Sequence, residues 1–198
     1  LLSSLATALR VAPTNGRCDL IDFTPLDVDL HAAVATTCHS FGPAVRVSRR
    51  RQLGAILADY VEEVRRRTES DDVRSARWIL VLHQLQRARD LDADAIPSYD
   101  ADDPGEPDSG TGLAAILRDG PEVGVHVVLT CDSYSRVQRR LGRGTAELGL
   151  RVGFQMNASD SQSMFDSEAA SRLKRHQAYF LDESSASLIK FRPFGFPR

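Results

Sequence analysis

In RWILVLHQ, residues 77–84, an unbroken apolar run from Trp78 to Leu82 ends abruptly at the polar pair His83 and Gln84. Such a run is too short for a helix and too continuous for a half-exposed strand. It therefore predicts a strand that is buried on both faces of a parallel sheet. Because open α/β sheets bind ligands at the carboxyl ends of their strands, His83 and Gln84 are the first candidates for a functional site.

The rest of the chain alternates apolar runs with helical patterns, which is the βαβ order of a parallel sheet. Further strands are predicted over 18–23, 44–47, 125–130 and 150–156, and a terminal hairpin over 178–181 and 187–191. Helices are predicted over 1–11, 53–64, 113–119 and 159–173. The predicted fold class is thus α/β, with a mostly parallel sheet flanked by helices and a terminal β-hairpin.

The helix over 53–64 has the clearest pattern, because its apolar residues recur at i, i+3, i+4, i+7, i+8 and i+11. Ser48 is its predicted N-cap. Its outer side carries Glu62, Glu63 and the run from Arg65 to Arg67. We expect a solvated face with i to i+4 ion pairs there.

Composition and charge exclude several classes of protein. The chain has 198 residues, 42% hydrophobic and 26% charged, which suits one soluble globular domain. Its net charge of −2 excludes binding of nucleic acid by bulk electrostatics but permits a local basic patch. Its three cysteines are widely spaced, which argues against a zinc site or a disulfide framework. No apolar run approaches the roughly 18 residues of a membrane span, so we expect a cytoplasmic protein without a membrane segment.

Residues 92–112 are acidic, rich in proline and glycine, and contain no basic side chain. A segment of this composition cannot bury enough apolar area to order itself. We expect a mobile surface loop that repels a phosphate backbone.

In this order, several segments resemble the FtsK/SpoIIIE branch of the RecA-like P-loop ATPases. LLSSLATALR (1–10) resembles the helix that follows a Walker A loop, and CDLIDF (18–23) resembles the next strand. WILVLHQL (78–85) occupies the Walker B place. LRDGPEVGVHVVLTCDS (117–133) is similar to the helix-Gly-strand segment that ends in a sensor residue, and RVGFQMNASDSQSMFDSEAASRL (151–173) to the segment that closes the core.

The resemblance implies that residues 1–198 form a single ATPase domain, incomplete at its N-terminus, that binds ATP and Mg²⁺. It also implies a homo-oligomeric ring in the full-length protein, acting on double-stranded DNA. The leading hypothesis is therefore an ATP-binding motor domain of an FtsK/SpoIIIE-like DNA translocase. The alternative is a degenerate nucleotide-binding or docking module without catalysis. A Rossmann-like protein is disfavoured, because no G-x-G-x-x-G follows a predicted strand.

The sequence departs from the family in two places. The G-x-x-x-x-G-K-[ST] loop that cradles phosphates is missing from the 198 residues. At the Walker B place, His83 and Gln84 replace the usual Asp and Glu. Neutral imidazole is a poor ligand for Mg²⁺, and glutamine can orient a water molecule but cannot accept its proton. We therefore expect weakened hydrolysis.

The resemblance places further candidates around the Walker B pair. Asp132 occupies the sensor position. Candidates for the nucleotide edge or an arginine finger are Asp22, Arg87, Arg89, Asp90 and Arg151. Candidates for contact with DNA or with a neighbouring subunit are Arg136, Arg139, Arg140 and Arg143. Plainer roles remain open for all of them: a strand-capping histidine, turn or cap acids, surface salt bridges and a solvated basic loop.

Overall fold

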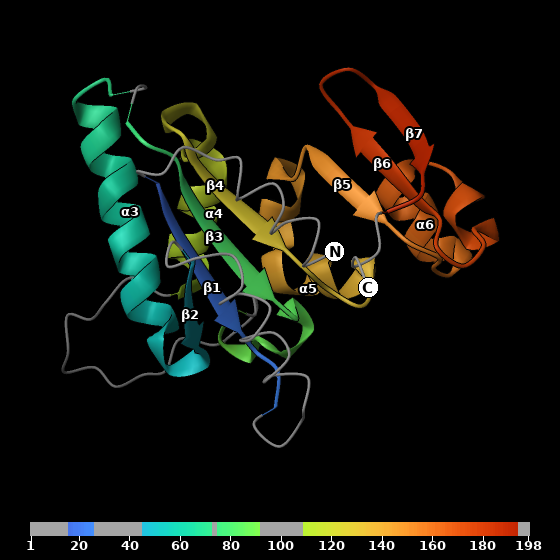
Figure 1. The fold of residues 1–198 in the computed structure, drawn as a ribbon, viewed down its shortest axis with the longest axis horizontal. Coiled ribbons are helices and arrows are strands. Elements are labelled where there is room, and N and C mark those ends of the chain that lie inside the picture. Colours follow the sequence, from blue (N-terminus) through green and yellow to red (C-terminus); the bar gives the residue numbers. More distant parts are fainter. Residues whose placement is uncertain (1–15, 26–44, 73–74, 92–108, 194–198) are drawn as a thin grey trace, which may run out of the picture.

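The computed structural model describes residues 16–25, 45–72, 75–91 and 109–193. Its main sheet has four parallel strands in the order β2-β1-β3-β4 (Figure 1). The strands are β1 (Arg17–Asp22), β2 (Val45–Arg49), β3 (Trp78–His83) and β4 (Val125–Leu129). β3 lies between two neighbours, and Leu80, Val81 and Leu82 are 0% exposed. The prediction of a strand buried on both faces is confirmed.

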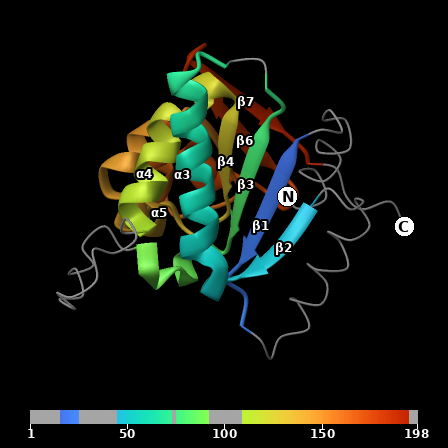
Figure 2. The same cartoon turned by 90° about the vertical axis from the view of Figure 1, so that its left-hand side faces the viewer.

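Two helices, α3 (Leu53–Glu69) and α4 (Ser109–Asp119), lie side by side on one face of this sheet (Figure 2). The predicted apolar stripe of α3 is buried against Leu80 and Leu82 of β3 and Ile116 of α4. The predicted α/β architecture is confirmed, whereas the helix predicted over 1–11 lies outside the described residues.

Three predicted boundaries are wrong for local reasons. Ser48 belongs to β2 and caps no helix, because a 3₁₀ turn, Arg50–Gln52, intervenes before α3. The loop predicted over 92–112 is shorter at its end, since α4 already begins at Ser109; residues 92–108 are not described. The helix predicted over 159–173 is interrupted at Asp166, which has a positive φ of 52°.

That interruption divides the segment into α6 (Ala158–Phe165) and a 3₁₀ helix, Glu168–Arg172. Both cover a second sheet, which is antiparallel and has the order β5-β6-β7. Its strands are β5 (Leu150–Gly153), β6 (Ala178–Asp182) and β7 (Ser187–Phe191). The predicted terminal hairpin of β6 and β7 is confirmed. The pairing of β5 with that hairpin is a feature that the sequence did not predict.

Close packing fixes one glycine of this second sheet. A Cβ atom at Gly153 would lie 2.5 Å from the ring of Phe165 in α6. The absence of a side chain therefore lets α6 approach β5. α6 is also tied to α5 (Tyr134–Leu141), because the buried Asp160 accepts a hydrogen bond of 3.1 Å from the backbone N–H of Ser135.

The outer side of α3 is only partly the solvated face that the sequence predicted. Arg65 pairs with Glu62 and Glu69 in solvent, as expected. Arg67 is only 1% exposed. Its guanidinium reaches Glu63 at 2.6 Å and the backbone oxygens of Val123 and Ala76 at 2.9 Å each. Arg67 thus ties α3 to the segments that lead into β3 and β4.

Candidate functional site at the carboxyl edge of the sheet

Three strands end together and bring polar residues into one row. Asp22, at the end of β1, is the register partner of His83, at the end of β3. Thr130 directly follows β4, whose last residue pairs with Leu82. Backbone hydrogen bonds hold Thr130 there, since its N–H donates to Leu82 at 3.0 Å and its carbonyl accepts from Leu85 at 2.8 Å. The row thus runs from a carboxylate through an imidazole to a hydroxyl.

His83 is anchored by Thr130. Its Nδ1 lies 2.8 Å from the Thr130 Oγ1, and the same oxygen accepts the backbone N–H of Gln84 at 2.9 Å. Burial lowers the pKa of His83, and the negative charge of Asp22 opposes this only in part. The imidazole is therefore neutral near pH 7.

Gln84 forms a tight corner immediately after β3. Its φ of 62° and ψ of 53° place it in the left-handed region, which costs a residue with a side chain about 1 kcal/mol or more. Its side-chain oxygen accepts a hydrogen bond of 2.9 Å from the Arg87 Nε. The corner turns the chain away from the sheet at the point where the Walker B acids are expected.

The two candidate carboxylates have local partners. Asp22 is 1% exposed, and its Oδ1 accepts from the backbone N–H and the hydroxyl of Thr24 at 2.9 and 2.6 Å. Asp132 is exposed and forms an ion pair with Arg136, one turn along α5. Thr130, rather than Asp132, is the β4 residue in contact with the Walker B pair. A polar residue directly after a buried strand is the signal by which the sequence could have identified it.

The arginines beyond the edge differ in their surroundings. Arg50, which is not among the site residues predicted from the sequence, forms two hydrogen bonds to the exposed Asp90. Arg140 is half-buried and donates to the Gln86 carbonyl at 2.9 Å. Arg89 is exposed. Arg140 and Asp90 thus pack around the loop that follows β3.

Arg151 lies farther away, in β5. Its side chain donates to the carbonyls of Leu148 and Met164 at 2.9 and 3.1 Å and pairs with Glu183 at 2.5 Å. To act on a neighbouring subunit, this arginine would have to give up these contacts. On α5, by contrast, Arg136, Arg139 and the following Arg143 are exposed.

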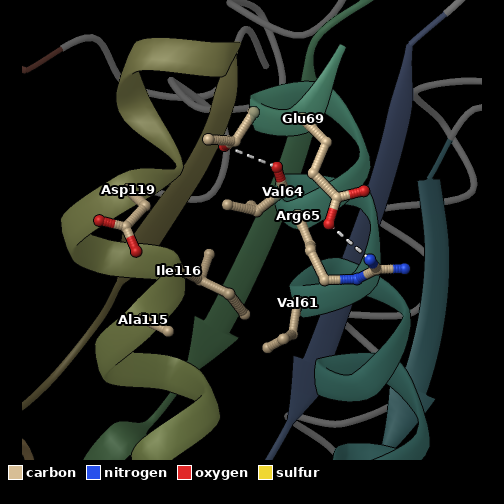
Figure 3. A pocket seen from close by; sticks show the side chains of 8 residues that line it. Val61, Val64, Arg65, Glu69, Ala115, Ile116 and Asp119 are labelled. Atoms are coloured by element: carbon tan, nitrogen blue, oxygen red, sulfur yellow. Dashed lines mark hydrogen bonds and ion pairs between the residues drawn. The ribbon is translucent and has the colours of Figure 1, made fainter. Parts of the chain in front are cut away.

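A groove lies between α3 and α4 (Figure 3). It has a volume of about 320 Å³ and a mostly apolar lining. The lining residues are Val61, Val64, Arg65, Thr68, Glu69, Ala115, Ile116 and Asp119. These belong to the C-terminal halves of both helices, which lie near the amino ends of the strands. The groove is therefore separate from the carboxyl edge.

No protein-family model and no curated protein sequence matches the chain, but solved structures do. The pCW3 conjugation coupling protein TcpA, in a monomer form with ATPγS, has a TM-score of 0.65 at 14% identity over 95% of this chain. The cytoplasmic domain of the type VII secretion ATPase EccC of Thermomonospora curvata has a TM-score of 0.65 at 17% identity over 96% of this chain. The genome packaging NTPase B204 of Sulfolobus turreted icosahedral virus 2, in complex with AMPPCP, has a TM-score of 0.55 at 12% identity over 98% of this chain.

The chain has the fold of the FtsK/SpoIIIE-type P-loop ATPases. At the level of the fold, the resemblance stated from the sequence is thus confirmed, and the low identities agree with a divergent sequence. The chain spans 54% of the TcpA chain and 23% of the EccC chain but 88% of B204.

Within this P-loop ATPase fold, the described residues do not suit a protein-bound Mg²⁺. No group of three or more His, Cys, Asp or Glu side chains in the described part of the chain could hold a metal ion. His83 and Gln84 offer an imidazole and an amide where Mg²⁺ prefers carboxylate oxygens. The described ranges also contain no helix that is long and apolar enough to cross a membrane.

Proposed function

We propose that the chain is the ATP-binding motor domain of an FtsK/SpoIIIE-like DNA translocase in which His83 and Gln84 weaken hydrolysis. The observation that carries the proposal is the carboxyl edge. It brings polar strand ends together at the edge where open α/β sheets bind ligands, while neither residue at the Walker B place is an acid. The nucleotide analogues bound to TcpA and B204 support ATP as the ligand.

In this proposal, a further strand beside β4 carries the Walker A loop. Within the described sheet, β4 pairs with β3 on one side and with no strand on the other, so one edge is available for that strand. Mg²⁺ would be held by the phosphates and water, because neither His83 nor Gln84 offers the carboxylate that it prefers.

The proposed contact with duplex DNA rests on α5. Arg139 and Arg143 are exposed and make no ion pair or hydrogen bond with another described residue. Their charges are thus available to phosphates. Arg118 offers a matched control, because it is equally exposed but lies on α4 and pairs with Asp119.

The proposed contact between neighbouring copies in a ring rests on the second sheet. Leu150 and Ile189 are 67% and 52% exposed on the second sheet, and apolar side chains gathered on a surface favour protein contact. The cytoplasmic location stays a prediction.

ATP binding and turnover by the full-length protein, with and without duplex DNA, test the proposal. We expect measurable binding and slow turnover that DNA stimulates; a protein that neither binds nor hydrolyses ATP overturns it. Replacing Arg139 and Arg143 by Gln should lower the salt dependence of DNA binding by about one unit of slope per arginine. Arg118→Gln should leave it unchanged.

The second candidate is a docking module without catalysis, which the missing acids at the Walker B place favour. The double change His83→Asp with Gln84→Glu separates the two. If it creates turnover that the parent lacks, the parent is a docking module. If it abolishes existing turnover, His83 and Gln84 take part in the chemistry.

A further inference from the structure

We infer that Thr130 holds His83 as the neutral tautomer protonated on Nε2, so that the tip of β3 offers an N–H donor to an anionic phosphate oxygen. The tautomer follows from the hydrogen bonds of Thr130 and from the burial of a neutral ring. The choice of ligand rests on the proposed nucleotide site.

The first step concerns the hydroxyl of Thr130. In the described part of the chain, two polar atoms lie within hydrogen-bond distance of its Oγ1: the Gln84 backbone nitrogen at 2.9 Å and the His83 Nδ1 at 2.8 Å. A backbone N–H can only donate, so Oγ1 accepts from Gln84. The hydroxyl proton then has one acceptor among these partners, which is Nδ1.

The second step concerns the imidazole. A neutral imidazole carries one proton, so an Nδ1 that accepts from Thr130 leaves that proton on Nε2. The opposite tautomer would place an N–H against the hydroxyl and leave the hydroxyl proton without an acceptor at a half-buried position. The lowered pKa that burial gives His83 keeps the ring neutral at pH 7.

The third step concerns what Nε2 can contact. No hydrogen bond joins it to any residue within the described ranges, and His83 stands at the carboxyl edge between Asp22 and Thr130. The usual acid at this position repels a phosphate unless a cation lies between them. A neutral N–H donor attracts the phosphate oxygen directly. Binding of nucleotide phosphate at this edge should therefore depend less on Mg²⁺ than it does with a carboxylate.

The tautomer is measured by NMR of the ring nitrogens in full-length protein labelled with [¹⁵N]histidine. We expect His83 with a protonated Nε2 and an unprotonated Nδ1 in the parent and in Thr130→Ser, which keeps the hydroxyl. In Thr130→Val we expect both tautomers. Thr145→Val is the matched control, because the hydroxyl of Thr145 is buried without a hydrogen-bond partner among the described residues, and it should leave the His83 signals unchanged.

A parent protein protonated on Nδ1 refutes the inference, and so does a folded Thr130→Val that keeps the parent tautomer. If Thr130→Val does not fold, the parent spectrum still decides, because it reports the tautomer directly.

The ligand is tested by titrating ATP into full-length protein in Mg²⁺ and in EDTA. His83→Gln places an amide N–H near the position of Nε2 and should keep the parent affinity in EDTA. His83→Phe removes the donor and should weaken binding there about tenfold or more, as expected for a hydrogen bond to a charged group.

Equal affinities of parent and His83→Phe in EDTA overturn the phosphate contact and leave the proposed motor function standing. A parent that binds no ATP under either condition overturns the proposed function and the phosphate contact together. The tautomer result is independent of both.

Discussion

Replacing Arg67 by Met should destabilise the fold far more than the same change at Arg66, one residue earlier. The Arg67 side chain is 1% exposed and donates to Glu63 and to two backbone oxygens at 2.6 to 2.9 Å. Methionine fills much of the volume but leaves the two backbone oxygens without this donor, while the Glu63 carboxylate keeps its hydrogen bonds from Arg66. Breaking a buried ion pair in this way typically costs about 3–5 kcal/mol.

The lower end of that range applies, because the Glu63 side chain is 15% exposed and water can partly replace its partner. We therefore expect a loss of about 3 kcal/mol in the free energy of unfolding. For a domain of this size, that corresponds to a fall in Tm of roughly 6–12 °C.

Urea unfolding followed by tryptophan fluorescence is the assay. Trp78 is the only tryptophan in the chain. The guanidinium carbons of Arg17 and Arg67 lie 4.5 and 5.7 Å from its ring centre, so its emission reports on this region. Arg66 is 49% exposed, and Arg66→Met should cost no more than about 1 kcal/mol. If Arg66→Met and Arg67→Met have the same free energy of unfolding, the three contacts of Arg67 do not stabilise the fold.

Four further changes have expected outcomes, each measured by urea unfolding. Gly112→Ala in α4 should stabilise the fold by about 0.5–1 kcal/mol through helix propensity, whereas Gly120→Ala should destabilise it, because a Cβ there would lie 2.4 Å from a carbonyl oxygen. A hydrogen bond from Arg66 is the largest cause that lowers the pKa of Glu63 from 4.5 to about 2. The stability that this carboxylate adds is therefore complete above pH 4.5 and is lost as the pH falls toward 2. The difference in the free energy of unfolding between the parent and Glu63→Gln should narrow over that pH range. Gln84→Gly should raise the free energy of unfolding by about 1 kcal/mol, because glycine adopts the left-handed conformation without strain. An unchanged or lower stability would contradict strain at that corner.

The main sheet was predictable because its signals are local. The apolar run of β3 has no polar residue to expose, so both faces of this strand must be covered. The apolar stripe of α3 identifies the side of the helix that is buried. The burial of Arg67 was not predictable in this way. Its charge and its place within an arginine run are typical of a solvated face, and its partner Val123 lies 56 residues away.

The pairing of β5 illustrates a second limit. A short alternating strand identifies which residues share a face but not which strand it joins. The register that pairs Val152 with Phe180 depends on the close approach of Phe165 to Gly153, and that contact is visible only in three dimensions.

At the candidate site, the rule that polar residues follow buried strands located His83 and Gln84 correctly at the carboxyl edge. The same rule applied to β4 selects Thr130. The acid at Asp132 drew attention because family sensors are polar, but Arg136 lies one helical turn ahead of it and forms an ion pair with it. Thr130 contacts His83 and Gln84 directly, whereas the sensor role of Asp132 stays a prediction.

The geometry of Gln84 bears on whether the carboxyl edge is a functional site or only the end of a strand. A glycine would adopt φ 62° without strain, yet this position carries a long amide whose oxygen is bonded to Arg87. Backbone strain of this kind gathers where a side chain has to be aimed. Gln84 can orient a water molecule even though it cannot accept a proton. A corner that keeps such a side chain at a cost in stability fits a slow nucleotide site better than a surface that serves only for docking.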